Sequence, residues 1–137
     1  MYRTGRAVVA VTDDHPLVRL ETLLLIGVGG FAGANLRYFV GLFVPGLGGT
    51  LVANATGSVA LGFLLYEAME TDLLAERSRV VFGTGFLSSF TTYSTFALQT
   101  IQATPLLGVL NVVGSYAFGF LGVLLGRFGA GLLAGGE

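Results

Sequence analysis

Residues 80–126 form a run of 47 residues without a charged side chain, and this run constrains the fold more than any other feature. About one residue in four is charged in an ordinary soluble domain, whereas this 137-residue chain has 11% charged and 53% hydrophobic residues. Such a chain cannot cover a soluble surface with ions, so we expect one small membrane domain. The net charge of −1 argues against a nucleic-acid-binding protein, which needs a basic surface.

The charged residues outside this run divide the rest of the chain into spans. They lie mainly before residue 22 and between residues 67 and 79. A membrane helix needs about 20 apolar residues, and four stretches meet this requirement: 22–44, 49–69, 80–103 and 106–126. We therefore predict an all-α membrane protein with a polar N-terminal extension (1–19), a four-helix transmembrane domain (20–127) and a C-terminal tail (128–137).

The arginines predict the orientation of these four spans. An even number of spans puts the N-terminus, the central loop and the C-terminus on one side of the membrane. That side carries six of the seven basic residues: Arg3, Arg6, Arg19, Arg77, Arg79 and Arg127. Because short flanks rich in arginine stay in the cytoplasm, we expect a multi-pass plasma-membrane protein with both termini in the cytoplasm.

Small residues recur four positions apart within the predicted spans. The pairs are Gly29/Gly33, Ala53/Gly57, Ser58/Gly62, Ser115/Gly119 and Gly122/Gly126. This spacing lets the backbones of two membrane helices approach closely. We therefore interpret most of these glycines as helix-packing residues.

The third span contains a segment that is poorly suited to a continuous helix. Six of the eight residues 88–95 are Ser or Thr, and hydroxyl side chains compete for the hydrogen bonds of the helix backbone. We predict a break near residues 88–92, where freed carbonyl groups are able to hold a cation, as they often do in transporter half-helices. The alternative is that the hydroxyls bond back to the preceding turn and the helix only bends.

The polar groups within the predicted spans are neutral, apart from Arg37. The middle of each span lacks Asp, Glu, His and Lys, on which acid–base catalysis and proton-coupled transport usually depend. The absence of Cys excludes thiolate metal sites, so we do not expect an enzyme. Amide and hydroxyl donors such as Asn54, Asn111 and Ser115, together with aromatic ring edges, suit a path for an anion.

Arg37 lies inside the first span, about two turns from its end. In one interpretation its side chain extends to the membrane interface. In the other it draws anions into a vestibule, since the spans offer no acid in mid-membrane to pair with it.

Three segments resemble motifs of one known family. Residues 29–38 look like GGxxGAxxRY, residues 49–58 like GTLxxNxxGS, and residues 85–96 like GFCGGxTTFSTF. Through them the chain resembles the Fluc (CrcB) fluoride channels from about residue 22 to residue 126. The resemblance implies a four-helix subunit, an antiparallel dual-topology dimer, two pores that export fluoride passively, and a structural sodium ion at the dimer centre.

The resemblance also implies roles for individual residues. The fluoride path falls on Asn54, Tyr93, Phe96, Ser115 and, near the vestibule, Arg37; the sodium ligands are the backbone carbonyls of Ser88 and Thr91. Two departures from the family pattern stand out: Ser88 and Ser89 replace a glycine pair, and Tyr93 replaces a phenylalanine. If residue 88 needs a positive φ, serine costs about 1 kcal/mol or more there.

The arginine distribution leaves the composition of the dimer open. A homodimer with both orientations needs a weak charge bias, whereas the bias here is six arginines to one at most. We therefore expect either a homodimer or a heterodimer with an oppositely oriented paralogue, surrounded by lipid. Two alternative functions are a small four-helix multidrug-type exporter and a partner subunit of a heterodimeric fluoride channel.

Overall fold

The computed structural model describes residues 15–135, and within them every regular element is helical. Three helices in this range are long and apolar enough to cross a membrane: α1 (Pro16–Phe43), α2 (Leu47–Glu70) and α6 (Pro105–Ala134). Four shorter segments lie between α2 and α6: α3 (Glu76–Arg79), η1 (Val80–Leu87), α4 (Ser88–Phe90) and α5 (Tyr93–Gln102). The prediction of an all-α membrane protein is confirmed.

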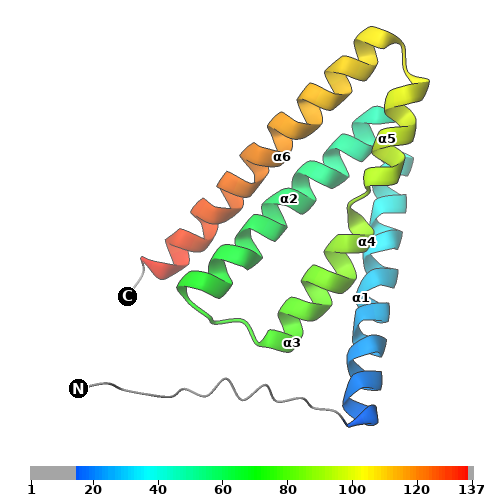
Figure 1. The fold of residues 1–137 in the computed structure, drawn as a ribbon. Helices are drawn as coiled ribbons and strands as arrows, with labels where there is room; N and C mark the ends of the chain where they lie inside the picture. Colours follow the sequence, from blue (N-terminus) through cyan, green and yellow to red (C-terminus); the bar gives the residue numbers. More distant parts are fainter. Residues whose placement is uncertain (1–14, 136–137) are drawn as a thin grey trace, which may run out of the picture.

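The helices form two side-by-side pairs whose members run in the same direction (Figure 1). One pair is α2 with α6, and the other is α1 with the column of α3, η1 and α4. The start of α1, the loop between α2 and α3, and the end of α6 lie at the same end of the molecule, where the two pairs diverge.

Glycines bring α2 and α6 into backbone contact. A Cβ atom at Gly122 would lie 2.8 Å from the Ala55 carbonyl oxygen, and one at Gly62 would lie 2.5 Å from that of Val123. Neither distance leaves room for a side chain. The predicted packing role of these glycines is therefore confirmed.

The second pair is packed in the same way. A Cβ atom at Gly29 would lie 2.6 Å from the Val81 carbonyl oxygen, and one at Gly85 would lie 2.7 Å from that of Ile26. Both helix pairs therefore pack through glycines that let the two backbones touch, although η1 is a π-helix rather than an α-helix. The wider turn of a π-helix is rare and often lies near a functional site. The sequence analysis did not predict it.

Two helices extend beyond the predicted spans. The helix α1 begins at Pro16, where His15 caps it by accepting a hydrogen bond from the Leu17 amide, whereas the predicted span begins at residue 22. The helix α6 continues to Ala134, eight residues beyond the predicted end at 126. Apolar length detects only the part of a helix that crosses lipid, and proline at the first turn favours an earlier start.

The predicted break in the third span is confirmed. The helix α4 ends at Phe90, and Thr91 and Thr92 are both extended before α5 begins at Tyr93. The back-bonding that the alternative assumed also occurs, because the Ser88 hydroxyl donates to the Thr84 carbonyl and the Thr91 hydroxyl donates to the Leu87 carbonyl. The hydroxyls therefore hold the last turn before the break and do not prevent it.

Candidate functional site

The break joins the C-terminal end of one short helix to the N-terminal end of the next. The Thr91 amide still donates to the Leu87 carbonyl at 2.9 Å, but at φ −81° and ψ 159° the backbone then leaves the helix. Thr92 caps α5 by accepting a hydrogen bond from the Thr95 amide at 3.2 Å. The break therefore leaves backbone groups at membrane depth that need partners from elsewhere.

Asn54 of α2 makes two hydrogen bonds to these backbone groups. Its Nδ2 donates to the Thr92 carbonyl at 2.9 Å, and its Oδ1 accepts from the Thr92 amide at 2.7 Å. The side-chain amide thus pairs with Thr92 as a neighbouring strand would. In a continuous helix the Thr92 amide would bond to the Ser88 carbonyl, so Asn54 releases that carbonyl from its helical partner.

Arg37 of α1 makes a third hydrogen bond to the backbone of the break. Its Nη1 donates to the Thr91 carbonyl at 3.3 Å. The guanidinium thus turns toward a main-chain carbonyl at the break, and the two sequence interpretations of Arg37 stay predictions. Neither interpretation considered this acceptor, because nothing near Arg37 in the chain indicates it.

Two cavities lie beside the break and share Thr92. The first, of about 420 Å³, is lined by residues that include Arg37, Thr50, Thr92, Thr95 and Gln99. The second, of about 390 Å³, is lined by residues that include Asn54, Ser58, Ser88, Thr91, Thr92 and Tyr93. Hydroxyl and amide groups therefore face open space on both sides of the break, together with one guanidinium.

Ser88, at the position where a glycine was expected, is unstrained. Its φ of −64° and ψ of −27° are those of a right-handed helix. The possible cost of serine at a positive φ therefore does not arise. The side chains of Ser88 and Thr91 line the same cavity.

The two aromatic residues of α5 are neighbours with different surroundings. The ring centroids of Tyr93 and Phe96 are 5.7 Å apart, at an interplanar angle of 47°. Phe96 is 8% exposed, whereas Tyr93 is 74% exposed and lines the second cavity. The structure thus brings Tyr93 to the break and buries Phe96 one turn further along.

The polar residues of α6 lie away from the two cavities. The Asn111 amide donates to the Thr100 hydroxyl of α5 at 2.8 Å. The Ser115 hydroxyl is buried without a hydrogen-bond partner among residues 15–135. Ser115 lines neither cavity beside the break, so the described chain does not join it to the other predicted path residues.

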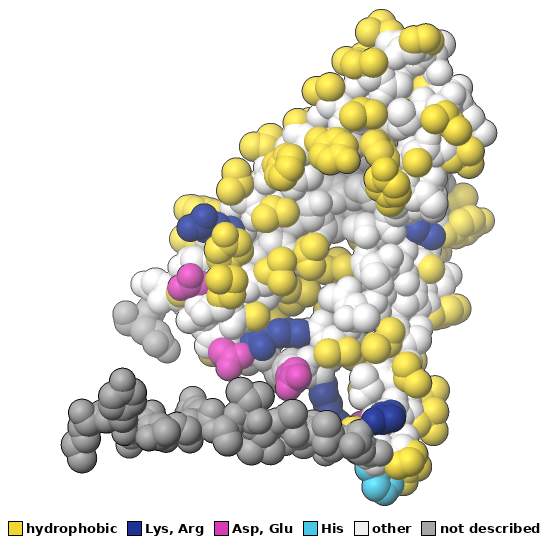
Figure 2. Space-filling view, in the orientation of Figure 1, with side chains coloured by type: hydrophobic (Ala, Val, Ile, Leu, Met, Phe, Trp, Pro, Cys, Tyr) yellow, Lys and Arg dark blue, Asp and Glu magenta, His cyan; other side chains and the backbone are white. Residues whose placement is uncertain are grey.

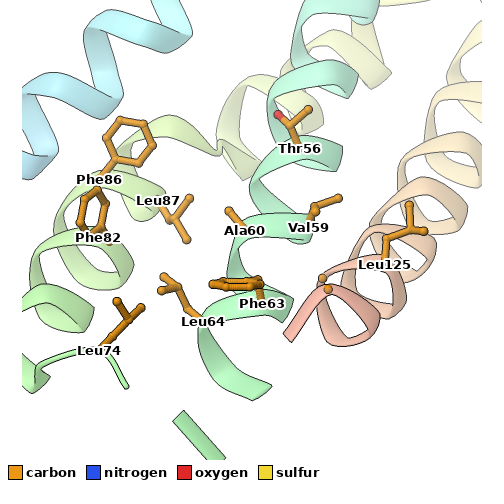
Figure 3. Close-up of a pocket in the computed structure, with 12 residues that line it drawn as sticks. Thr56, Val59, Ala60, Phe63, Leu64, Leu74, Phe82, Phe86, Leu87 and Leu125 are labelled. Atoms are coloured by element: carbon orange, nitrogen blue, oxygen red, sulfur yellow. The ribbon is translucent and has the colours of Figure 1, made fainter. Parts of the chain in front are cut away.

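A larger cavity, of about 590 Å³, lies between η1, α2 and α6 (Figure 3). Its lining is apolar except for Thr56 and includes Phe63, Phe82, Phe86 and Leu125. In Figure 3, Leu87 of η1 and Leu64 of α2 lie in the space between these two helices. This cavity lacks the donors that an anion needs, and it is not part of the candidate site.

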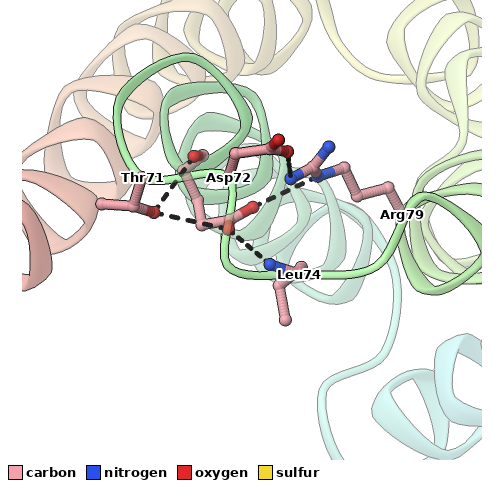
Figure 4. A network of polar contacts seen from close by, with 5 residues as sticks. Thr71, Asp72, Leu74 and Arg79 are labelled. Atoms are coloured by element: carbon pink, nitrogen blue, oxygen red, sulfur yellow. Dashed lines mark hydrogen bonds and ion pairs between the residues drawn. The ribbon is translucent and has the colours of Figure 1, made fainter.

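A charged network closes the loop between α2 and α3 (Figure 4). The Glu67 carboxylate is 1% exposed and accepts from the Leu74 amide at 2.7 Å and from Arg79 Nε at 3.3 Å. Arg79 also pairs with Asp72, and this hydrogen bond raises the pKa of the Arg79 guanidinium. The sequence placed Glu67 in a charged cluster and gave no indication that it is buried.

The chain matches one protein family and several curated relatives. The model of the family described as CrcB-like protein, Camphor Resistance (CrcB), matches residues 24–127. A relative from Haloarcula marismortui named fluoride-specific ion channel FluC 1 is 60% identical over 126 residues, which cover 92% of this chain and 98% of the relative.

Two further relatives carry similar names. The fluoride-specific ion channel FluC 2 of Halobacterium salinarum is 54% identical over 104 residues, which cover 75% of this chain and 81% of the relative. The fluoride-specific ion channel FluC 1 of Natronomonas pharaonis is 50% identical over 109 residues, which cover 78% of this chain and 92% of the relative. With the family model matched over residues 24–127 and relatives of 50–60% identity, the chain belongs to the CrcB-like protein family.

Proposed function

We propose that this protein is a fluoride-selective channel that lets fluoride leave the cytoplasm passively. The observation that carries the proposal is the helix break, with cavities beside it whose linings include hydroxyl and amide groups and, in one of them, the Arg37 guanidinium. Fluoride is small and strongly hydrated, so a path must replace its water with hydrogen-bond donors. The names of the relatives point to the same ion.

The proposed path uses neutral donor groups, which bind fluoride less tightly than a cluster of cationic side chains would. Asn54, Tyr93 and Phe96 would contact fluoride through amide, hydroxyl and ring-edge groups, and Ser115 would add a hydroxyl from α6. Arg37 would raise the concentration of anions in the 420 Å³ cavity.

Fluoride efflux from proteoliposomes tests this proposal. Vesicles loaded with fluoride and diluted into fluoride-free buffer should release it through the purified protein, as measured with a fluoride electrode. Vesicles loaded with chloride serve as the control and should release it much more slowly. Equal release of both ions, or no release of fluoride, would contradict the proposal.

A structural sodium ion at the break is part of the proposal. A hard cation prefers oxygen ligands, and the Ser88 carbonyl has lost its helical donor to Asn54. The Ser88 and Thr91 carbonyls would hold the ion, and Thr91 would share its oxygen with Arg37. Replacing sodium with N-methylglucamine on both sides of the vesicle membrane should lower the thermal stability of the assembled protein.

The proposed assembly is an antiparallel dimer, either of two identical chains or of this chain with an oppositely oriented paralogue. We also infer that both termini of this chain face the cytoplasm, because arginine in the sequence gathers in the segments next to the start of α1, the α2–α3 loop and the end of α6. Figure 2 shows most of the basic and acidic side chains of the described residues toward that end of the molecule. Labelling a cysteine introduced at residue 137 from each membrane face measures the orientation. Equal labelling from both faces would favour the homodimer.

A multidrug-type exporter is the second candidate, favoured only by the 590 Å³ apolar cavity. Coupling to protons usually needs a free carboxylate within the membrane, whereas Glu67 is already paired with Arg79. Transport of a lipophilic cation that responds to a proton gradient would support this candidate over the channel.

A further inference from the structure

The helix α5, which carries Tyr93 and Phe96, is held near both of its ends by a side-chain amide from another helix. At its N-terminal end, Asn54 of α2 pairs with the backbone of Thr92. In its second half, Asn111 of α6 donates through Nδ2 to the Thr100 hydroxyl at 2.8 Å. Phe96 lies between these two anchors.

The second anchor leads directly to the backbone of Phe96. The Thr100 hydroxyl accepts from Asn111 and donates to the Phe96 carbonyl at 2.7 Å. A chain of hydrogen bonds therefore runs from α6 through Thr100 to the residue that bears the buried ring. Asn111 and Phe96 are each 8% exposed, so neither group has ready access to water as an alternative partner.

The backbones of α5 and α6 also meet at this point. A Cβ atom at Gly108 would lie 3.0 Å from the Thr100 carbonyl oxygen. Gly108 thus allows the close approach that brings Asn111 within reach of Thr100. A close backbone approach and a hydrogen bond thus both join α6 to α5 at Thr100.

We propose that Thr100 and Asn111 are positioning residues that hold the Phe96 ring in the fluoride path by fixing the rotation of α5. This inference rests on the proposed function for its effect on transport. Neither residue lines the two cavities beside the break. Without the anchor, α5 turns about its N-terminal attachment at Thr92, and the Phe96 ring moves relative to that of Tyr93, which now lies 5.7 Å away.

The first test is fluoride efflux from proteoliposomes that contain single variants. Thr100→Val keeps the side-chain volume and removes both hydrogen bonds, and Asn111→Leu removes the donor. We expect each to lower the efflux rate about tenfold, which corresponds to about 1.4 kcal/mol in barrier height. The double variant should be no slower than the slower single variant, because both changes break the same chain, and Thr100→Ser should restore efflux.

Two matched control variants separate this role from a general loss of polar groups. The Thr56 hydroxyl donates to the Val52 carbonyl at 2.7 Å, and the Asn35 amide donates to the Phe31 carbonyl at 2.7 Å, both within one helix. Thr56→Val and Asn35→Leu should therefore keep normal efflux. Losses equal to those of Thr100→Val and Asn111→Leu, or additive losses in the double variant, would overturn the inference.

A second measurement reports the surroundings of the Phe96 ring directly. The 19F resonance of 4-fluorophenylalanine at position 96 should shift in Thr100→Val and in Asn111→Leu, and should return in Thr100→Ser. An unchanged resonance in both variants would overturn the positioning role even if efflux falls. A wild-type chain without fluoride efflux would refute the proposed function, while a shifted resonance would still support the positioning role.

Discussion

Two regions interrupt the helices between α2 and α6, and they satisfy their backbone groups in opposite ways. The loop between α2 and α3 is held by the ionised groups of Glu67, Asp72 and Arg79. The break between α4 and α5 is held by the neutral amide of Asn54 and by one arginine bonded to a carbonyl. The difference follows depth. Near the membrane surface Asp72 is 78% exposed and keeps its hydration, and the buried Glu67 is compensated by Arg79, whereas an acid at membrane depth is costly.

The comparison predicts that removing the neutral partner of the break lowers the stability of the protein more than removing a charge from the loop does. Asn54→Leu removes the side-chain partner of both the amide and the carbonyl of Thr92, a residue that is 8% exposed. We expect a loss of about 2–6 kcal/mol, at about 1–3 kcal/mol for each group, together with loss of fluoride efflux. Thermal unfolding in detergent measures the first effect, and Asn35→Leu is the matched control. A melting temperature equal to that of the control would contradict the role of Asn54.

A smaller loss is expected where α2 approaches the break. A Cβ atom at Gly57 would overlap the Thr91 side chain, which is held by its own bond to the Leu87 carbonyl. Gly57→Ala should therefore cost about 1–3 kcal/mol through overpacking. Gly114→Ala, at a glycine with open space around its Cβ position, should be tolerated. Equal melting temperatures for these two variants would show that the break rearranges around the added methyl group without losing stability.

The charged loop should respond to salt, unlike the break. Glu67→Gln keeps the shape of the side chain and removes its attraction for Arg79. We expect a lower melting temperature at low ionic strength and a slightly smaller difference from wild type at high ionic strength, since salt weakens in part the wild-type attraction between Glu67 and Arg79, whose side chain is 22% exposed. The exposed Glu70→Gln is the matched control. A difference that does not change with salt would show that shape, and not charge, holds the loop.

The smallest effect is expected at Asp72, the non-glycine residue with a positive φ, 50°, in the described chain. Asparagine tolerates this conformation as well as aspartate does, and the Asp72 side chain is 78% exposed. Asp72→Asn should therefore change the unfolding free energy by less than about 1 kcal/mol. Chemical denaturation measures it, and a larger loss would show that this exposed pair contributes more than a surface ion pair usually does.

Much of the fold could be predicted from local composition. The helix break near residues 88–92 followed from hydroxyl side chains, and the packing of Gly29 and Gly122 followed from spacing alone. The π-helix Val80–Leu87 and the helical residues 128–134 could not be predicted in this way. Helix winding depends on the packing of α1 against η1, and hydropathy does not report helical turns beyond the lipid.

The site was predicted in part. Asn54 and Arg37 were expected to face an ion, and the structure shows both bonded to the backbone of the break. Thr92 was missed as a site residue, although it lines both cavities. Its place in the run of hydroxyl residues was the available signal. The roles in transport of Asn54, Tyr93, Phe96, Ser115 and Arg37, and those of Ser88 and Thr91 toward sodium, stay predictions.

The sequence by itself determined that this chain crosses a membrane, that its third span breaks, and that neutral donors are left inside the spans. Each of these properties depends on residues close together in the chain. Only the tertiary structure decided which groups complete the break, because Asn54 is 38 residues from Thr92 and Arg37 is 54 residues from Thr91. Local composition predicts that freed backbone groups need partners, and only the packing of the helices selects them.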